Sequence, residues 1–200
     1  MNSPAAVDLY WLPLGAGGTS VRWNGRAFEA VAARVKHRSV RDLYHSALEV
    51  VLPETGRYVI EQAPVPDGRG ADRGVVIEGS VGTRLAGHAR IFRYEVRRWR
   101  DGAIPDVAEA VESPHRLTND PRIAQRLWDS VPSLPAPAWG RDELGAGEMW
   151  NSNSIVSWLL VRSGVPIEGI HPPTGGRAPG WNAGIVVAQR EHSRPMAPRR

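Results

Sequence analysis

The sequence predicts an α+β domain in which a mainly antiparallel sheet packs against a buried helix. Before residue 100, short apolar runs with alternating or β-branched residues are separated by turn sequences, which is typical of antiparallel strands. After residue 120, the apolar residues take helical spacing. A chain of 200 residues that is 42% hydrophobic can build one core. We therefore expect one domain over residues 1–189 and a basic disordered tail over residues 190–200.

The first half of the chain predicts one strand, one helix and then four strands in a meander. The expected strand 43–52 has an apolar face that only Ser46 interrupts. The Pro-Glu-Thr-Gly sequence that follows it has turn chemistry, which predicts a hairpin with the next strand. In chain order, we expect strand 8–14, helix 24–37 and strands 43–52, 57–62, 74–81 and 88–99.

The second half predicts helices connected by segments rich in Pro and Gly. Asp120 followed by Pro121 is typical of an N-cap with proline in the first turn, so residues 121–131 should be helical. Residues 154–163 are apolar nearly all round, which indicates a buried helix. We also expect a short helix at 107–112, a short last strand at 184–188, and disorder after Gln189.

The charge and residue usage narrow the function class. The formal net charge of +4 falls to +1 without residues 190–200, so no nucleic-acid partner is predicted. The nearest basic stripe is Arg93, Arg97 and Arg98, for which we favour an edge strand with a solvated arginine face. Because the chain has no Cys, disulfides and thiolate chemistry are excluded. The sequence contains no run of 18 apolar residues, so no membrane span is predicted. It also shows no secretory-signal pattern, and we therefore expect a cytoplasmic protein.

The histidines show no metal-ligand spacing, and the glycine clusters lack complete phosphate-binding motifs, so no metal or cofactor is expected. Two other features carry possible chemistry. His45 lies inside an expected strand with the small Ala47 beside it on the same face, and the buried helix starts with four small polar residues, Asn151 to Ser154. A serine at a helix N-terminus can use the unpaired N–H groups there to stabilise an oxyanion. The alternative is ordinary helix capping, for which Asn and Ser are preferred.

The segments that hold these residues are Tyr-His-Ser-Ala-Leu-Glu-Val at 44–50, Tyr-Val-Ile-Glu-Gln-Ala-Pro at 58–64 and Trp-Asn-Ser-Asn-Ser-Ile-Val at 150–156. Together they resemble the circularly permuted papain-like hydrolases of the NlpC-type clan, which include the lecithin–retinol acyltransferase-like and PPPDE groups. In those families a strand histidine comes first, and a helix that starts with Asn-Cys supplies the nucleophile. The third segment has Ser where Cys would stand, and it also resembles an uncharacterised bacterial family with an Asn-Ser-Asn-Thr helix start.

The resemblance implies a permuted papain-like fold and a serine-type amidase, peptidase or acyltransferase that acts on a small-molecule or peptide substrate. In this interpretation Ser152 is the nucleophile, His45 is its base, and Glu61 orients the imidazole. Asn151 and Asn153 then lie beside the substrate or the oxyanion. A serine hydroxyl stays protonated until attack, so the base must take its proton and must itself be firmly oriented.

Three questions stay open at the level of the sequence. A hairpin register shifted by one residue places Gln62 instead of Glu61 on the face of His45. The domain could also be a catalytically inactive papain-like binding domain, or an ordinary α+β scaffold with an accidental likeness. The oligomeric state has no signal in the sequence.

Overall fold

The computed structural model describes residues 4–14, 41–65, 74–82, 87 and 92–193. The expected helix 24–37 and the start of the expected strand 88–99 lie outside these ranges, as do residues 194–200 of the expected tail. The strands are β1 (Ala6–Pro13), β2 (Tyr44–Leu52), β3 (Gly56–Pro64), β4 (Val75–Ser80), β5 (Arg93–Arg100) and β6 (Val111–Thr118). The helices are the 3-10 turns η3 (Val107–Glu109) and η4 (Val131–Ser133) and the α-helices α2 (Pro121–Ser130), α3 (Ser152–Ser163) and α4 (Trp181–His192).

The strands form one antiparallel sheet in the order β4-β5-β3-β2-β1-β6. The antiparallel sheet and the α+β class are therefore confirmed. The expected meander is wrong in one detail, because β5 and not β4 lies next to β3. The hairpin of β2 and β3 is confirmed, and its register pairs Leu48 with Ile60 and Leu52 with Gly56.

The sheet has an edge strand that the sequence did not indicate. We expected a helix over 107–112, but only the single turn η3 forms there, and β6 follows it along β1. Pro114 lies within this strand, most of its residues are at least partly exposed, and its pairing with β1 is irregular. An exposed edge strand lacks the alternation that identifies a half-buried strand, so no period-2 pattern marks it.

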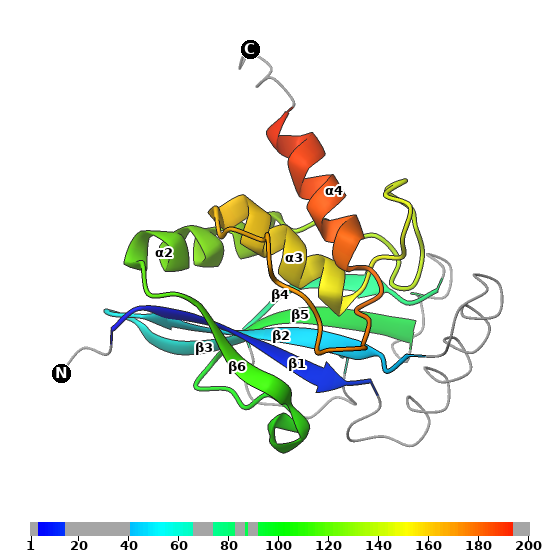
Figure 1. The fold of residues 1–200 in the computed structure, drawn as a ribbon. Helices are drawn as coiled ribbons and strands as arrows, with labels where there is room; N and C mark the ends of the chain where they lie inside the picture. The colour runs from blue at the N-terminus through cyan, green and yellow to red at the C-terminus, as the bar shows by residue number, and fades with distance from the viewer. Residues whose placement is uncertain (1–3, 15–40, 66–73, 83–86, 88–91, 194–200) are drawn as a thin grey trace, which may run out of the picture.

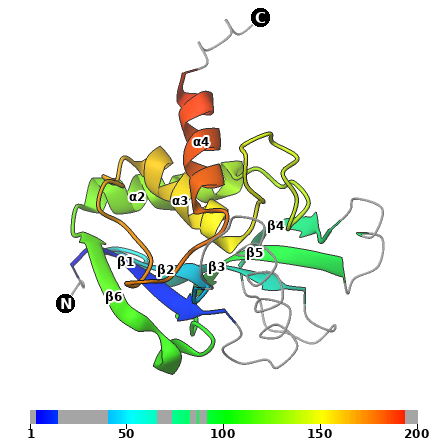
Figure 2. The ribbon, with the colours of Figure 1, turned by 45° about the vertical axis from the view of Figure 1, so that its right-hand side comes forward.

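α2 and α3 lie over one face of the sheet, and α4 packs on α3 and points away from the sheet (Figures 1 and 2). The apolar residues of β2 that we expected on one face, Leu48, Val50 and Leu52, belong to the core beneath these helices together with Tyr44. Trp158 and Leu159 on α3 are 1% and 0% exposed, so the expected burial of this helix is confirmed. Asp120 caps α2 as expected, since its side chain accepts a hydrogen bond from Arg122 N at 2.8 Å.

The last element corrects two expectations. Residues 184–188 belong to α4 and not to a strand, and this helix continues past Gln189 to His192. The β-branched run at 185–187 favours a strand on local propensity, but packing against α3 selects a helix. Gly184 lies against the start of α3, where a Cβ would overlap the carbonyl oxygen of Ser154 and the hydroxyl of Ser157. The helix can approach α3 this closely because residue 184 has no side chain.

Candidate functional site

The start of α3 is a complete capping box. Asn151 is the N-cap, and its Oδ1 accepts hydrogen bonds from Asn153 N at 2.9 Å and from Ser154 N at 3.3 Å. In return, the Ser154 hydroxyl accepts from Asn151 N at 3.1 Å. These reciprocal bonds satisfy backbone N–H groups that a helix otherwise leaves unpaired. The same groups are therefore not available to an oxyanion.

Asn153 joins α3 to the sheet. Its Oδ1 accepts a hydrogen bond from the Ser46 hydroxyl at 2.9 Å, and its Nδ2 donates to the carbonyl oxygens of Tyr44 at 3.0 Å and Pro179 at 2.9 Å. The residue is 2% exposed. A buried amide with its donors and acceptor in use is a structural connection between β2, α3 and the loop before α4.

Ser154 and Asn151 connect the same helix start to α4. The Ser154 hydroxyl donates to Gly180 O at 2.7 Å, and Asn151 Nδ2 donates to Pro179 O at 2.8 Å. Three of the four small polar residues at this helix start are therefore explained by capping and by contacts between elements. Ser152 is the exception, because its hydroxyl forms no hydrogen bond within the described residues, and the residue is 9% exposed.

His45 lies on the other face of the sheet from α3. Successive residues of a strand point to opposite faces, and Ser46 is the neighbour that contacts α3. Ala47, on the face of His45, packs in a separate small cluster with Leu12 and Val59. The structure therefore does not bring His45 and Ser152 together, and Ser46 occupies the position on β2 that faces the helix start.

The surroundings of His45 also affect its proton chemistry. Burial lowers the pKa of the imidazole to about 4, and the opposing effect of the Asp106 carboxylate is smaller. The ring is therefore neutral near pH 7. A base whose conjugate acid has so low a pKa is weak, because proton transfer is most efficient when the pKa lies near the working pH.

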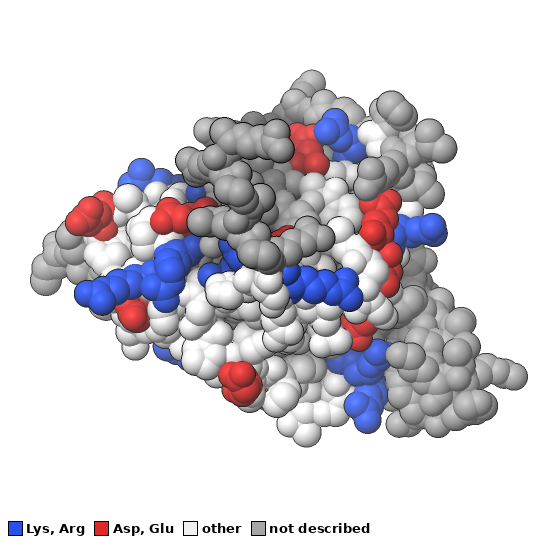
Figure 3. All heavy atoms as spheres, turned by 90° about the horizontal axis from the view of Figure 1, so that it is seen from above, with Lys and Arg blue, Asp and Glu red and all other residues white. Residues whose placement is uncertain are grey.

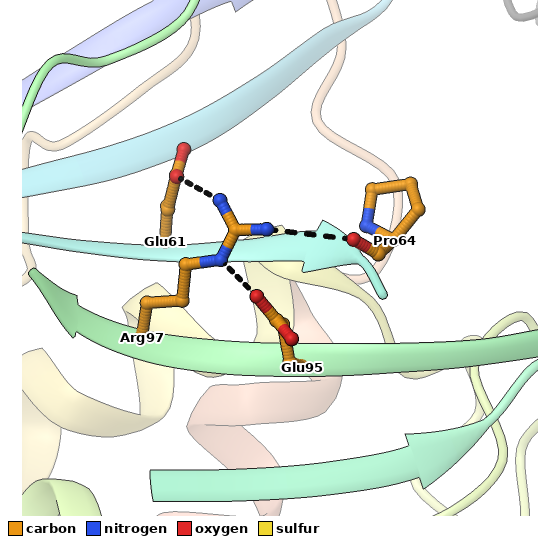
Figure 4. Close-up of polar contacts among 4 residues, drawn as sticks. All are labelled: Glu61, Pro64, Glu95 and Arg97. Carbon is orange, nitrogen blue, oxygen red and sulfur yellow. Dashed lines mark hydrogen bonds and ion pairs between the residues drawn. The ribbon is translucent and has the colours of Figure 1, made fainter. Parts of the chain in front are cut away.

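Glu61 shares the face of His45, and Gln62 does not. Gln62 pairs with Val96, which belongs to the core beneath the helices, whereas Glu61 pairs with Arg97 on the opposite face. Arg97 Nη1 donates to Glu61 Oε1 at 3.2 Å (Figure 4). The hairpin register therefore places Glu61, and not Gln62, on the side of the histidine.

Arg97 links two buried carboxylates. Its Nε donates to Glu95, and its Nη2 reaches the carbonyl oxygen of Pro64 at 3.5 Å (Figure 4). The side chains of Glu61, Glu95 and Arg97 are 8%, 5% and 7% exposed. This buried guanidinium bridge connects β3 and β5, and removing Arg97 would break the ion pairs of both carboxylates at once.

The arginines that form the basic stripe of the sequence have partners inside the molecule. Arg93 forms an ion pair with Glu78 on β4, and the Arg98 guanidinium lies 4.1 Å from the ring centroid of Trp128 on α2. The expected edge position of this strand is wrong, because β5 lies between β4 and β3. Seen from above, basic and acidic side chains are interspersed across the described surface (Figure 3).

Within the described ranges, no group of three or more His, Asp or Glu is placed to hold a metal ion. No helix in that part of the chain is long and apolar enough to cross a membrane. No protein-family model, curated protein or solved structure matches the sequence or the fold of this chain.

Proposed function

We propose that this chain is a non-catalytic binding domain with a fold that resembles the permuted papain-like hydrolases. The observation that carries the proposal is the hydrogen bond between Ser46 and Asn153, at the point where a base on β2 would have to face the helix start. A serine nucleophile needs a base within hydrogen-bond reach. The residue of β2 that faces the start of α3 is a serine, whose hydroxyl is already committed to the amide of Asn153.

The polar residues around Ser152 support the same proposal. The resemblance assigns Asn151 and Asn153 to the substrate or the oxyanion. Their side-chain amides instead form hydrogen bonds within the capping box, to β2 and to the loop before α4. These hydrogen bonds connect the helix start rigidly to its neighbours and leave few side-chain donors for a substrate. A rigid scaffold without an activated nucleophile is suited to holding a ligand and not to transforming it.

A serine-type hydrolase or acyltransferase that uses Ser152 is the second candidate. The observation in its favour is the Ser152 hydroxyl, which lies at the first position of a buried helix and makes no hydrogen bond to another described residue. In this version the base is a group other than His45, because His45 points to the opposite face of the sheet.

A covalent probe distinguishes the two candidates. For the binding domain, a fluorophosphonate probe should give no labelling of the purified chain at Ser152, measured by intact mass. For the hydrolase, labelling should occur and should be lost in Ser152→Ala while it persists in His45→Ala. Labelling that is lost in both variants would restore the pairing of Ser152 with His45 and would overturn the binding-domain proposal.

An introduced thiol gives an independent measurement of the same site. In the binding domain, Ser152→Cys should react with iodoacetamide no faster than Ser133→Cys, an exposed thiol on η4. A neighbouring base or an anion-stabilising site would lower the thiol pKa and accelerate the reaction near neutral pH. A faster reaction at Ser152→Cys that His45→Ala slows would therefore contradict the proposal.

A further inference from the structure

The side-chain amide of Gln62 on β3 is buried without a hydrogen-bond partner. Its Oε1 and Nε2 are both buried and form no hydrogen bond to any residue that the structure describes, although the residue as a whole is partly exposed. The amide is therefore turned into the protein and away from the surface. A buried polar group without a partner lowers stability, and sequences break such local rules chiefly at functional sites.

Gln62 lies where β2 and β3 separate beneath the start of α3. The pairing of these strands ends at Leu48 and Ile60, while β3 continues along β5. The next pair on the same face, if this register continued, would be Ser46 with Gln62. The Ser46 hydroxyl is committed to Asn153 on α3. The amide of Gln62 is therefore beside the start of α3 but takes no part in the bond that joins α3 to the sheet.

Ser152 lies on the side of α3 that faces β3 and β5. Ser154 faces α4, since its hydroxyl donates to Gly180 O at 2.7 Å. α4 begins on the β1 side of α3, where the ring centroids of Trp181 and Trp11 are 5.0 Å apart. Ser152 precedes Ser154 by two residues, which is about 200° around a helix, so its side chain points away from α4. In the sheet order, that direction leads from β2 toward β3 and β5.

Trp150 borders the same region from the β5 side. It is 2% exposed, and its indole Nε1 is a second buried donor that finds no acceptor among the described residues. Its carbonyl oxygen accepts from Gly140 N at 2.8 Å, and the neighbouring Trp139 ring lies edge-on to Tyr94 of β5, with centroids 6.4 Å apart. This segment is the yellow-green loop over β4 and β5 in Figure 2. The polar groups without partners that border this region are therefore those of Gln62, Ser152 and Trp150.

We propose that Gln62 binds the neutral amide group of a ligand, such as a peptide or carboxamide, and this rests on the binding-domain function proposed above. A planar side-chain amide presents a donor and an acceptor side by side, so its complement is another amide. The ligand N–H donates to Gln62 Oε1, and the ligand carbonyl oxygen accepts from Nε2. The Ser152 hydroxyl and the Trp150 indole N–H are the further donors on that side of α3. Rotation of the partly exposed Gln62 side chain gives the ligand access from the surface.

The same chemistry excludes ions. A carboxylate has no donor for Gln62 Oε1, and an ammonium group has no acceptor for Nε2. Burying either charge without a counter-ion is also unfavourable. The site should therefore select neutral amides over ions of similar size.

The binding test uses acetamide and the full chain, and follows the backbone amide signals of residues 61–63 in ¹H–¹⁵N spectra. Acetamide should shift these signals saturably, and acetate and methylammonium should bind several-fold more weakly. Gln62→Met should weaken acetamide binding by about tenfold, because both hydrogen bonds to the ligand are lost. The matched control is Gln189→Met, an exposed glutamine on α4, which should bind like the native chain.

The same variants give a readout that needs no ligand. Methionine has a volume similar to that of glutamine and no polar group that needs a partner. Gln62→Met should therefore raise the melting temperature by about 2–4 °C, measured by circular dichroism. Gln189→Met should change the melting temperature little, because its side chain is exposed.

The outcomes separate this proposal from the one it rests on. No saturable shift with acetamide, equal affinity in Gln62→Met, or equal affinity for acetate overturns the amide site, while the absence of fluorophosphonate labelling still supports a binding domain. A lower melting temperature in Gln62→Met also overturns the site, since it shows that the amide already has a stabilising partner such as a bound water. Labelling of Ser152 together with acetamide binding at Gln62 overturns the purely binding function and leaves the amide site standing.

Discussion

The Ser46 hydroxyl on β2 donates a hydrogen bond of 2.9 Å to Asn153 Oδ1 on α3, across 107 positions of sequence. Neither residue is exposed by more than 2%. This bond lies on the face of β2 that is turned toward the helix layer, and alternation along the strand places His45 on the other side. The contact connects the sheet to α3, and the two residues that the resemblance would pair, His45 and Ser152, lie on opposite sides of the sheet.

The first prediction concerns that anchor. Asn153→Ala removes the hydrogen-bond partners of the Ser46 hydroxyl and of Tyr44 O and leaves these buried groups unsatisfied, whereas Pro179 O keeps Asn151 Nδ2 as a donor. The free energy of unfolding should fall by about 3 kcal/mol, since each orphaned group costs about 1–3 kcal/mol and relaxation recovers part. Urea unfolding followed by tryptophan fluorescence measures it. The control is Ser133→Ala, an exposed site that should stay within about 0.5 kcal/mol of the native chain.

The second prediction tests the bridge between Glu61 and Glu95. Arg97→Met keeps most of the side-chain volume but leaves two buried carboxylates without their shared guanidinium. We expect a loss of about 3–5 kcal/mol in the free energy of unfolding. The control is the surface ion pair of Arg93 and Glu78, whose side chains are 39% and 38% exposed. Arg93→Met breaks this pair and should lower the free energy of unfolding by about 1 kcal/mol or less.

A second variant keeps this prediction interpretable if Arg97→Met alone does not fold. Adding Glu95→Gln to Arg97→Met removes the buried charge of Glu95, whose ion pair with Arg97 is already broken, so part of the stability should return. Equal stability of the single and double variants would show that the buried charges do not govern the effect.

The third prediction concerns pH. Burial lowers the pKa of His45 from 6.5 to about 4, so the folded state favours the neutral imidazole. The contribution of this residue to stability is complete above pH 6.5 and is lost as the pH falls from 6.5 toward 4, because the unfolded chain takes up the proton first. The full loss is about 3 kcal/mol, at 1.36 kcal/mol for each unit of pKa.

His45→Gln provides the reference for this measurement, because it keeps a polar side chain that does not titrate. The difference in unfolding free energy between the native chain and the variant should change as the pH falls from 7 to 4.5, with the native chain losing more. A constant difference across this range would show that the pKa of His45 is the same in the folded and unfolded states, which would contradict the prediction.

The sequence predicted most of the elements because their signals are local. The hairpin turn, the Asp120 N-cap and the apolar helix 154–163 each follow from neighbouring residues, and each is confirmed. The failures depend on contacts between distant parts of the chain. β6 is a strand only because β1 offers a pairing edge, and α4 is a helix because Gly184 permits close packing on α3.

The candidate site could be located from the sequence, but its geometry could not. Four small polar residues in a row did mark the start of α3, and the alternation of β2 did single out Ser46 as the break in its apolar face. The sequence did not show which residue the Ser46 hydroxyl contacts. The capping by Asn151 and Ser154 is the alternative that the sequence offered, but the bonds of Asn153 to Ser46 and Tyr44 join distant segments and follow from no local pattern.

The last prediction sets helix propensity against packing. In an isolated helix, Gly184→Ala should stabilise α4 by about 1 kcal/mol, because alanine is the better helix former. Here the added methyl group would overlap Ser154 O and the Ser157 hydroxyl, which itself donates to Trp181 O at 2.6 Å. We therefore expect a net loss of about 1–3 kcal/mol, the usual cost of overpacking a core. Asn182→Ala, on the exposed side of the same helix, gains propensity without a clash and should be neutral or stabilising in the same urea titration. If Gly184→Ala is as stable as the native chain or more so, the close approach of α3 and α4 is not what selects a helix over residues 184–188.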